Sequence, residues 1–201
     1  VSESLFEEIL ENAPEVNGIR IGDYLLENGD YTRPRKDLSE DEVVGIVAGF
    51  HDEEPIITAL TFFVGAYDKR YNSKFGKYYN SNKDAIKAFN GRIITKRYKE
   101  GNRVSRFEAF EACINYRKDK DEEWYFGAVG EVATMIDNCI YLNAAHQITG
   151  LGFVIDNEWY SSCSEYNCRC SWNCISNLGE AGCYWCYKDR KDRVIPFLAY
   201  K

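Results

Sequence analysis

Methionine and histidine are scarce in this chain of 201 residues, which has one Met and two His beside 15 Tyr. His51 falls in a predicted turn and His146 at the end of a predicted helix, so neither is placed to activate a Cys or Ser nucleophile. Histidine-assisted nucleophilic catalysis is therefore not expected. The shortage of Met and the abundance of Tyr favour strands and loops over a helical bundle, and we expect a mixed α+β fold.

An excess of positive charge and a long apolar run are also missing. The 32 acidic residues outnumber the 25 Lys and Arg, which gives a formal net charge of -7. Nucleic-acid binding needs Lys and Arg concentrated against phosphates. The one basic stretch, 87–106, is interrupted by apolar residues, and we interpret it as a solvated strand or loop face. No apolar run approaches the roughly 20 residues that span a bilayer. We expect neither a nucleic-acid partner nor membrane insertion.

The first residues have the pattern of a short amphipathic helix. Apolar residues recur at helical spacing from Leu5 to Leu10, after a Ser that can cap the helix, and Pro14 ends the pattern. We interpret residues 1–17 as a helical connector or the end of a longer chain. The chain length then supports one further domain over 18–201.

Strand patterns open this domain and return near its end. Early strands are expected over 18–26, 43–50 and 56–64, with a hairpin between the last two. Residues 66–82 are expected to form a long irregular loop. The later strands are expected at 152–155, 158–161, around Trp172, around Tyr184 and at 194–200.

Helical patterns occupy the middle of the domain. One helix is expected at 105–117, where Ser105 and Glu108 have capping-box spacing, and a second at 129–147. A short helical turn is expected at 84–89. The domain is thus predicted to contain two well-formed helices among short strands.

Small polar and large aromatic residues interleave over 163–193 without helical or strand periodicity. Tyr and Trp give rigid amphipathic contact area and Ser, Asn and Gly adapt, so this composition is typical of a contact surface. We predict a binding face with aromatic anchors at Tyr166, Trp172, Tyr184, Trp185 and Tyr187. Its polar contacts are predicted at Asn167, Arg169, Asn173, Asp189 and Arg190. Trp172 is also a candidate for the core.

Eight cysteines are present, and six of them are crowded between Cys163 and Cys186. Cys113 and Cys139 fall within apolar helical patterns and are predicted to be buried thiols. The six others leave three alternatives: a zinc site, one or more disulfides, or reduced thiols on a variable surface. Only the pair Cys183 and Cys186 has a spacing usual for zinc, so we predict no metal site and no cofactor.

Four local features, in this order, resemble the C-type-lectin-like fold. They are Gly22-Asp23-Tyr24 with Asn28-Gly29-Asp30-Tyr31 and the strand Val44-Gly45-Ile46-Val47; Phe89-Asn90-Gly91; Trp124-Tyr125 with Gly130-Glu131; and Trp159-Tyr160-Ser161-Ser162 with Arg193-Val194-Ile195-Pro196. The specific likeness is to the FISUMP-type family of bacterial surface and phage tail proteins. It extends to the related variable proteins of diversity-generating retroelements.

The resemblance implies a C-type-lectin-like fold with two helices and short, mostly antiparallel strands. It also implies a receptor-binding or adhesion module on a phage tail, another virion appendage or a bacterial surface. Such a module would bind a host-surface glycan or protein through 163–193 as a homo-oligomer, for which a trimer is one candidate. Diversification of 163–193 is a further hypothesis. The alternative is a structural virion protein that joins other subunits, and a distant one is an enzyme of the formylglycine-generating kind.

Overall fold

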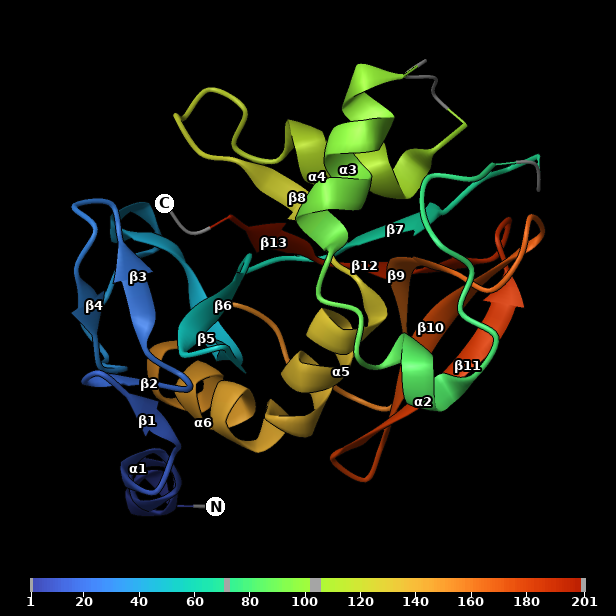
Figure 1. Cartoon of the computed structure of the whole chain (residues 1–201). Coiled ribbons are helices and arrows are strands. Elements are labelled where there is room, and N and C mark those ends of the chain that lie inside the picture. Colours follow the sequence, from blue (N-terminus) through green and yellow to red (C-terminus); the bar gives the residue numbers. More distant parts are fainter. Residues whose placement is uncertain (1, 71–72, 102–105, 200–201) are drawn as a thin grey trace.

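Strands predominate in the first and last parts of the chain and helices in the middle (Figure 1). The computed structural model describes residues 2–70, 73–101 and 106–199. Its helices are α1 (Glu3–Glu11), α2 (Asn82–Ala85), α3 (Gly91–Glu100), α4 (Glu108–Asn115), α5 (Val129–Asp137) and α6 (Cys139–Thr149), with a 3₁₀ turn at Glu40–Glu42. Its strands are β1 (Glu15–Val16), β2 (Ile19–Arg20), β3 (Tyr24–Leu26), β4 (Tyr31–Thr32), β5 (Val43–His51), β6 (Glu54–Thr58), β7 (Phe63–Ala66), β8 (Trp124–Phe126), β9 (Trp159–Glu165), β10 (Cys170–Asn177), β11 (Glu180–Tyr187), β12 (Lys191–Val194) and β13 (Pro196–Leu198). The α+β class is confirmed.

The strands form two main sheets. One has the order β4-β3-β5-β6-β13-β8 and the other the order β11-β10-β9-β12-β7, while β1 and β2 form a small ribbon. The six-stranded sheet is antiparallel, whereas β12 runs parallel to β9 in the five-stranded sheet. The chain passes between the sheets from β6 to β7 and again from β12 to β13. Because β6 pairs with β13 and β7 with β12, the two crossings start and end on neighbouring strands and link the sheets into one frame.

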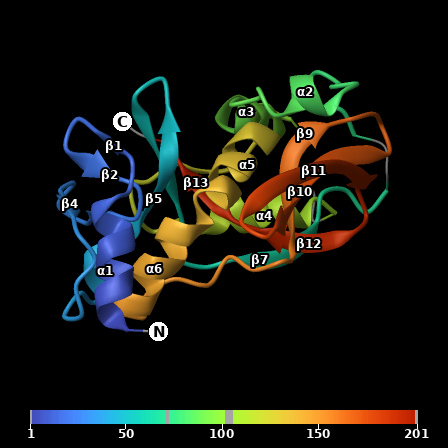
Figure 2. The same ribbon diagram turned by 90° about the horizontal axis from the view of Figure 1, so that it is seen from below.

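Helix α5 packs between the two sheets (Figure 2). It contacts β5 on one side and β9, β10 and β11 on the other. Val129, Val132, Met135 and Ile136 are buried on this helix, so apolar residues around most of its circumference fill the core. The helix therefore packs against the inner face of the sheet that contains β9, β10 and β11.

The predicted helix at 129–147 is broken into α5 and α6 at Asn138. The side-chain amide of Asn138 donates hydrogen bonds to the carbonyl oxygens of Ala48, at 3.0 Å, and Thr134, at 2.9 Å. The first bond ties the break to β5.

None of the helices in the described part of the chain is long and apolar enough to cross a membrane.

The prediction for the basic stretch 87–106 was wrong. Its centre forms helix α3, in which Gly91, Ile94, Thr95 and Tyr98 are buried at i, i+3, i+4 and i+7 spacing. The basic side chains occupy the remaining, solvated faces. Helical periodicity was present in the sequence, but the high charge of the stretch obscured it.

Several predicted elements are confirmed with altered ends. The hairpin β5–β6 forms with a turn at Asp52 and Glu53, the helical turn becomes α2, and the helix at 105–117 becomes α4. Its predicted cap, Ser105, lies outside the described residues. The strand predicted at 152–155 does not form.

The predicted last strand splits into β12 and β13, and its predicted end at Tyr200 lies outside the described residues. The helix predicted near the N-terminus forms as α1, which packs against α6. The division of the chain at residue 17 and the C-type-lectin-like fold stay predictions.

Candidate binding face on the C-terminal hairpin

The predicted face centres on the hairpin formed by β10 and β11. These strands pair along their full length, from Cys170 opposite Tyr187 to Asn177 opposite Glu180. Leu178 and Gly179 form the turn with φ of 53° and 93°, which is the left-handed pair that a two-residue hairpin turn needs. Full pairing makes the hairpin a rigid support for the side chains that it carries.

Strand β11 is an edge of its sheet, and part of that edge is covered. The amide of Asn82 donates a hydrogen bond to the carbonyl oxygen of Cys183 at 2.6 Å. The backbone N–H of Ala181 donates to the Asp137 carboxylate at 2.7 Å. Because these outward backbone groups are occupied, another strand cannot pair with this half of β11 without displacing both side chains.

Three large aromatic side chains on β11 are exposed. Tyr184, Trp185 and Tyr187 have exposed fractions of 53%, 50% and 58%. Because successive residues of a strand point to opposite faces, Tyr184 projects from one face of the sheet and Trp185 from the other. The hairpin therefore presents aromatic surface on both sides of the edge.

On the first face, Tyr184 meets an aromatic and charged cluster. Its ring lies edge-on to that of Trp159 at 5.9 Å, and the Arg190 guanidinium lies 4.5 Å from the Trp159 ring centre. Arg190 Nε also donates to Asp192 at 2.8 Å, which fixes the guanidinium. Burial raises the pKa of Asp192, while its hydrogen bonds from Asn173 and Arg190 oppose that shift.

The placement of Asn173 corrects one prediction. This side chain is buried, and its Nδ2 donates to Asp192 Oδ2 at 2.7 Å. Asn173 lies opposite Tyr184 in the register and shares its face, where it is part of the polar layer beneath the exposed cluster. It therefore supports Arg190 through Asp192 and is not available for contact with a ligand.

On the second face, Trp185 stacks on Tyr166. Their ring centres are 5.6 Å apart and their planes differ by 12°. Tyr166 also lies edge-on to Trp172, which is buried and donates its Nε1–H to the carbonyl oxygen of Tyr79 at 2.8 Å. Trp172 thus belongs to the core, which was the second role considered for it in the sequence. Its ring contacts Tyr166 and so supports the stacked rings of Tyr166 and Trp185.

The remaining predicted contacts lie in two adjacent turns. Asn167 accepts hydrogen bonds from the backbone N–H groups of Arg169 and Cys170, so it shapes the turn between β9 and β10. The turn after β11 lies beside it, since the Lys188 N–H donates to the Arg169 carbonyl oxygen at 3.0 Å. Arg169, Asp189 and Arg190 are exposed there. The structure brings these residues to one end of the hairpin.

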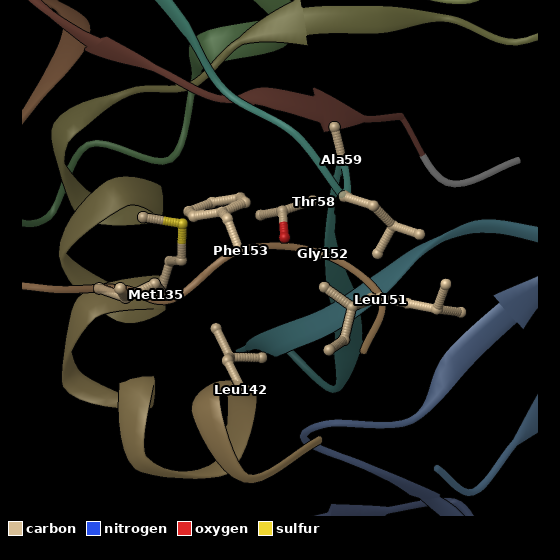
Figure 3. Close-up of a pocket in the computed structure, with 10 residues that line it drawn as sticks. Thr58, Ala59, Met135, Leu142, Leu151, Gly152 and Phe153 are labelled. Atoms are coloured by element: carbon tan, nitrogen blue, oxygen red, sulfur yellow. The ribbon is translucent and has the colours of Figure 1, made fainter. Parts of the chain in front are cut away.

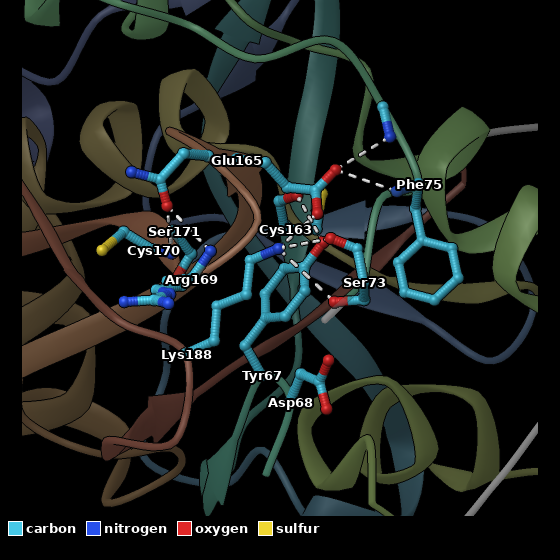
Figure 4. A network of polar contacts seen from close by, with 12 residues as sticks. Tyr67, Asp68, Ser73, Phe75, Cys163, Glu165, Arg169, Cys170, Ser171 and Lys188 are labelled. Carbon is cyan, nitrogen blue, oxygen red and sulfur yellow. Dashed lines mark hydrogen bonds and ion pairs between the residues drawn. The ribbon is translucent and has the colours of Figure 1, made fainter. Parts of the chain in front are cut away.

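A buried charge pair beneath the face was missed from the sequence (Figure 4). Lys188 Nζ lies 2.5 Å from Glu165 Oε1, and both side chains are fully buried. Lys188 also donates to the Ser73 carbonyl oxygen at 2.8 Å, and Glu165 accepts the N–H groups of Phe75 and Gly76 at 2.9 and 3.0 Å. The pair ties the segment after β7 to the C-terminal strands. Charged residues in a polar segment are usually exposed, so little in the sequence could indicate this buried pair.

The positions of the hairpin cysteines along their strands argue against zinc, which was one of the three alternatives for them. Cys183 and Cys186 are three residues apart on one strand and point to opposite faces, whereas Cys170 and Cys174 share a face about 13 Å apart along the strand. Ligands of one zinc ion must lie much closer together. Among the described residues, no group of three or more His, Cys, Asp or Glu side chains is arranged to hold a metal ion.

Two cavities lie away from the hairpin. The first is an apolar space of about 20 Å³ lined by Met135, Leu142, Leu151 and Phe153 among others (Figure 3). It has room for about one water molecule and is a packing gap in the core. The second is an open pocket of about 180 Å³ whose lining includes Glu131 and no residue of β9, β10 or β11. Neither contributes to the predicted face.

Comparison with known proteins gives a fold relationship. No family model and no curated protein matches the chain. Among solved structures, the chain is similar to a fimbrial protein from Bacteroides ovatus ATCC 8483, with a TM-score of 0.64 and 14% sequence identity. The similarity covers 90% of this chain and 49% of the fimbrial protein, so the chain spans about half the length of that protein. At this identity the likeness shows a shared fold.

Proposed function

We propose that this protein is a non-enzymatic binding module that is displayed on a cell surface or on a virion appendage and attaches to a host-surface glycan or protein. The observation that carries the proposal is the exposure of Tyr184, Trp185 and Tyr187 on one edge strand. Large aromatic groups give contact area at a small loss of conformational entropy, which is why they dominate binding surfaces. A group of three on one short strand supports recognition through this hairpin.

The surroundings of these rings support a preformed site. Tyr166 and Trp159 contact the exposed rings from below, and the ion pair of Glu165 with Lys188 holds the base of the hairpin. A side chain that is already held in place loses little freedom when a ligand arrives. The expected polar contacts are therefore the groups at the hairpin's end, Asn167, Arg169, Asp189 and Arg190.

The fold likeness to a fimbrial protein supports a location on a surface appendage. Modules of this kind gain strength from repetition, because several weak contacts act together once copies are held side by side. We therefore propose a homo-oligomer, with a trimer as one candidate, in contact with other subunits of the appendage. Burial raises the pKa of the Cys113 and Cys163 thiols, so both are weak nucleophiles, which is compatible with a non-enzymatic role.

The finer proposal is a C-type-lectin-like domain whose segment 163–193 is diversified. Mutation of the adenines in Asn codons does not produce Glu, Lys or Trp, and Glu165, Lys188 and Trp172 are buried. The same mutation can produce Tyr, and Tyr184 and Tyr187 are exposed. Glu180, Trp185 and Lys191 are residue types that this mutation does not produce either, and they are exposed. A nucleotide template repeat in the source genome would support diversification, and its absence would remove the idea.

The binding proposal is tested by displaying the protein in many copies on beads and presenting it to glycan panels and to cell surfaces. The key variant carries Tyr184→Ala, Trp185→Ala and Tyr187→Ala. The control carries Ile93→Ala and Ile140→Ala, because these side chains are equally exposed, at 55% each, but lie on α3 and α6. Circular dichroism and thermal unfolding confirm that each variant is folded.

We expect the wild type and the control to bind the same targets and the aromatic variant to lose at least tenfold in apparent affinity. A folded aromatic variant that binds as strongly as the wild type would contradict the proposal. If no protein binds any target, a structural role in the appendage replaces it.

A further inference from the structure

Two of the hairpin cysteines face each other directly. Cys174 lies opposite Cys183 in the register of β10 and β11, and their sulfur atoms are 2.7 Å apart. Opposite residues of antiparallel strands have Cα atoms about 4.5–5.5 Å apart, a spacing that lies within the range that a disulfide spans. Both side chains are buried against α5, where Cys174 Sγ also contacts the Val129 carbonyl oxygen. The distance between the two sulfur atoms and the pairing of the two strands therefore both place Cys174 and Cys183 for a disulfide bond.

The other cysteines of the hairpin are separated by the geometry of the strands. Cys186 lies opposite Ser171, so it points to the face away from Cys170, Cys174 and Cys183. Cys170 shares the face of Cys174 but is four residues away, about 13 Å along the strand. The alternation of the strands thus selects one pair.

We propose that Cys174 and Cys183 form a disulfide that locks the hairpin carrying the exposed aromatic side chains. The oxidant is a small-molecule or protein disulfide, R–S–S–R. One cysteine thiolate attacks it to give a mixed disulfide and one RS⁻, and the second thiolate then displaces the other RS⁻. The two cysteines lose two protons and two electrons, and the oxidant becomes two R–SH. This inference does not rest on the proposed binding function.

The burial of the pair sets when the bond forms. Burial raises the pKa of Cys174 well above its ordinary value, so in the folded protein this group stays a protonated, weakly nucleophilic thiol. Because both sulfur atoms are buried, an external disulfide reaches them only before the hairpin packs against α5. Once formed, the same burial shields the bond from external thiols.

The chain offers a sharp mapping experiment. Trypsin cuts after Arg169 and Lys188, and a glutamyl endopeptidase cuts after Glu180, which separates the two cysteines. The full chain is reduced in denaturant and refolded with reduced and oxidised glutathione. It is then returned to denaturant, where the remaining free thiols are alkylated. The digest is analysed by mass spectrometry without reduction. Refolding in the presence of the oxidant exposes every thiol to it before burial.

We expect the fragments 170–180 and 181–188 to be linked, with alkyl groups on Cys170 and Cys186. We expect the intact wild type to be about 2 Da lighter than its reduced form and to unfold at a higher temperature. Unlinked fragments with all four cysteines alkylated would overturn the proposal, and so would a link through Cys170 or Cys186. In the matched variants, Cys186→Ser keeps the link and Cys183→Ser abolishes it. If Cys183→Ser fails to fold, the wild-type map still decides.

Discussion

Lys188 and Glu165 place opposite charges in the interior directly beneath the candidate face. Removing a charge from water is costly, and the loss is recovered only when the partner and the remaining hydrogen-bonding groups are all in place. Here Ser73 and the backbone N–H groups of Phe75 and Gly76 complete the set. The ion pair between Lys188 and Glu165 thus holds the end of β11 against the end of β9.

Replacing one partner leaves the other charge unpaired. We expect Lys188→Met to lower the free energy of unfolding by about 3–5 kcal/mol. The double variant Lys188→Met with Glu165→Gln is expected to recover part of this loss, because no buried charge remains. Denaturant unfolding of the three proteins measures both effects. A single variant as stable as the wild type would show that the pair does not hold the hairpin.

Glu131 is a second buried carboxyl group, at the start of α5. It accepts hydrogen bonds from the N–H groups of Ala128 and Gly91 and from the Tyr125 hydroxyl group. Burial raises its pKa to about 7, and the hydrogen bonds act in the opposite direction. The folded protein therefore binds a proton at pH values where the unfolded chain has released it.

The raised pKa of Glu131 predicts a pH-dependent stability. The stabilisation is complete below the unfolded pKa of 4.5 and is lost as the pH rises through 7, an effect of up to about 3 kcal/mol. Glu131→Gln removes this titration while it keeps an acceptor for the backbone. We expect the stability of the variant relative to the wild type to increase between pH 5 and pH 8 in urea unfolding. Parallel pH profiles for the two proteins would refute the assignment.

At the scale of elements, the turn between β10 and β11 places Leu178 in a backbone conformation that a leucine adopts unfavourably. Leu178 is 95% exposed and adopts a φ of 53°, a conformation that Asn accepts more readily than Leu. We expect Leu178→Asn to raise the free energy of unfolding by about 0.5–1 kcal/mol. Gly179→Ala, at a φ of 93°, serves as the opposite control and should lower it. Thermal unfolding decides, and a destabilised Leu178→Asn protein would argue against this turn.

Much of the element order could be predicted from the sequence, because it rests on local patterns. The hairpin β5–β6, the helix near the N-terminus and the strands around Trp172 and Tyr184 all follow from periodicity and turn residues. The break at Asn138 could not be predicted, because it depends on a bond to β5 from a distant part of the chain.

The candidate face also has features that could be predicted from the sequence and features that could not. Its aromatic composition indicated the segment, and three of its five predicted anchors have half or more of their surface exposed. The burial of Asn173 could not be predicted, since it depends on which face of β10 is covered by Trp159, Tyr184 and Arg190. The pairing of Lys188 with Glu165 depends on long-range packing that composition does not contain.

At the scale of the whole molecule, the face lies at the end opposite α1. Both ribbon views place α1 on one side of the molecule and the strands β10 and β11 on the other (Figures 1 and 2). The two sheets, the crossings between them and α5 connect these ends rigidly. The strand that carries the three exposed aromatic residues thus lies away from the N-terminal helix, which is compatible with the proposed binding function.

The most direct measurement of the central claim is the dissociation constant of single variants on a target that the wild type binds. We predict that Tyr184→Ala and Trp185→Ala each weaken binding by about tenfold or more, since each removes a large ring from a preformed cluster. Ile93→Ala, on α3, should leave the constant unchanged. If both aromatic variants are folded and bind with the wild-type constant, recognition does not occur through this hairpin.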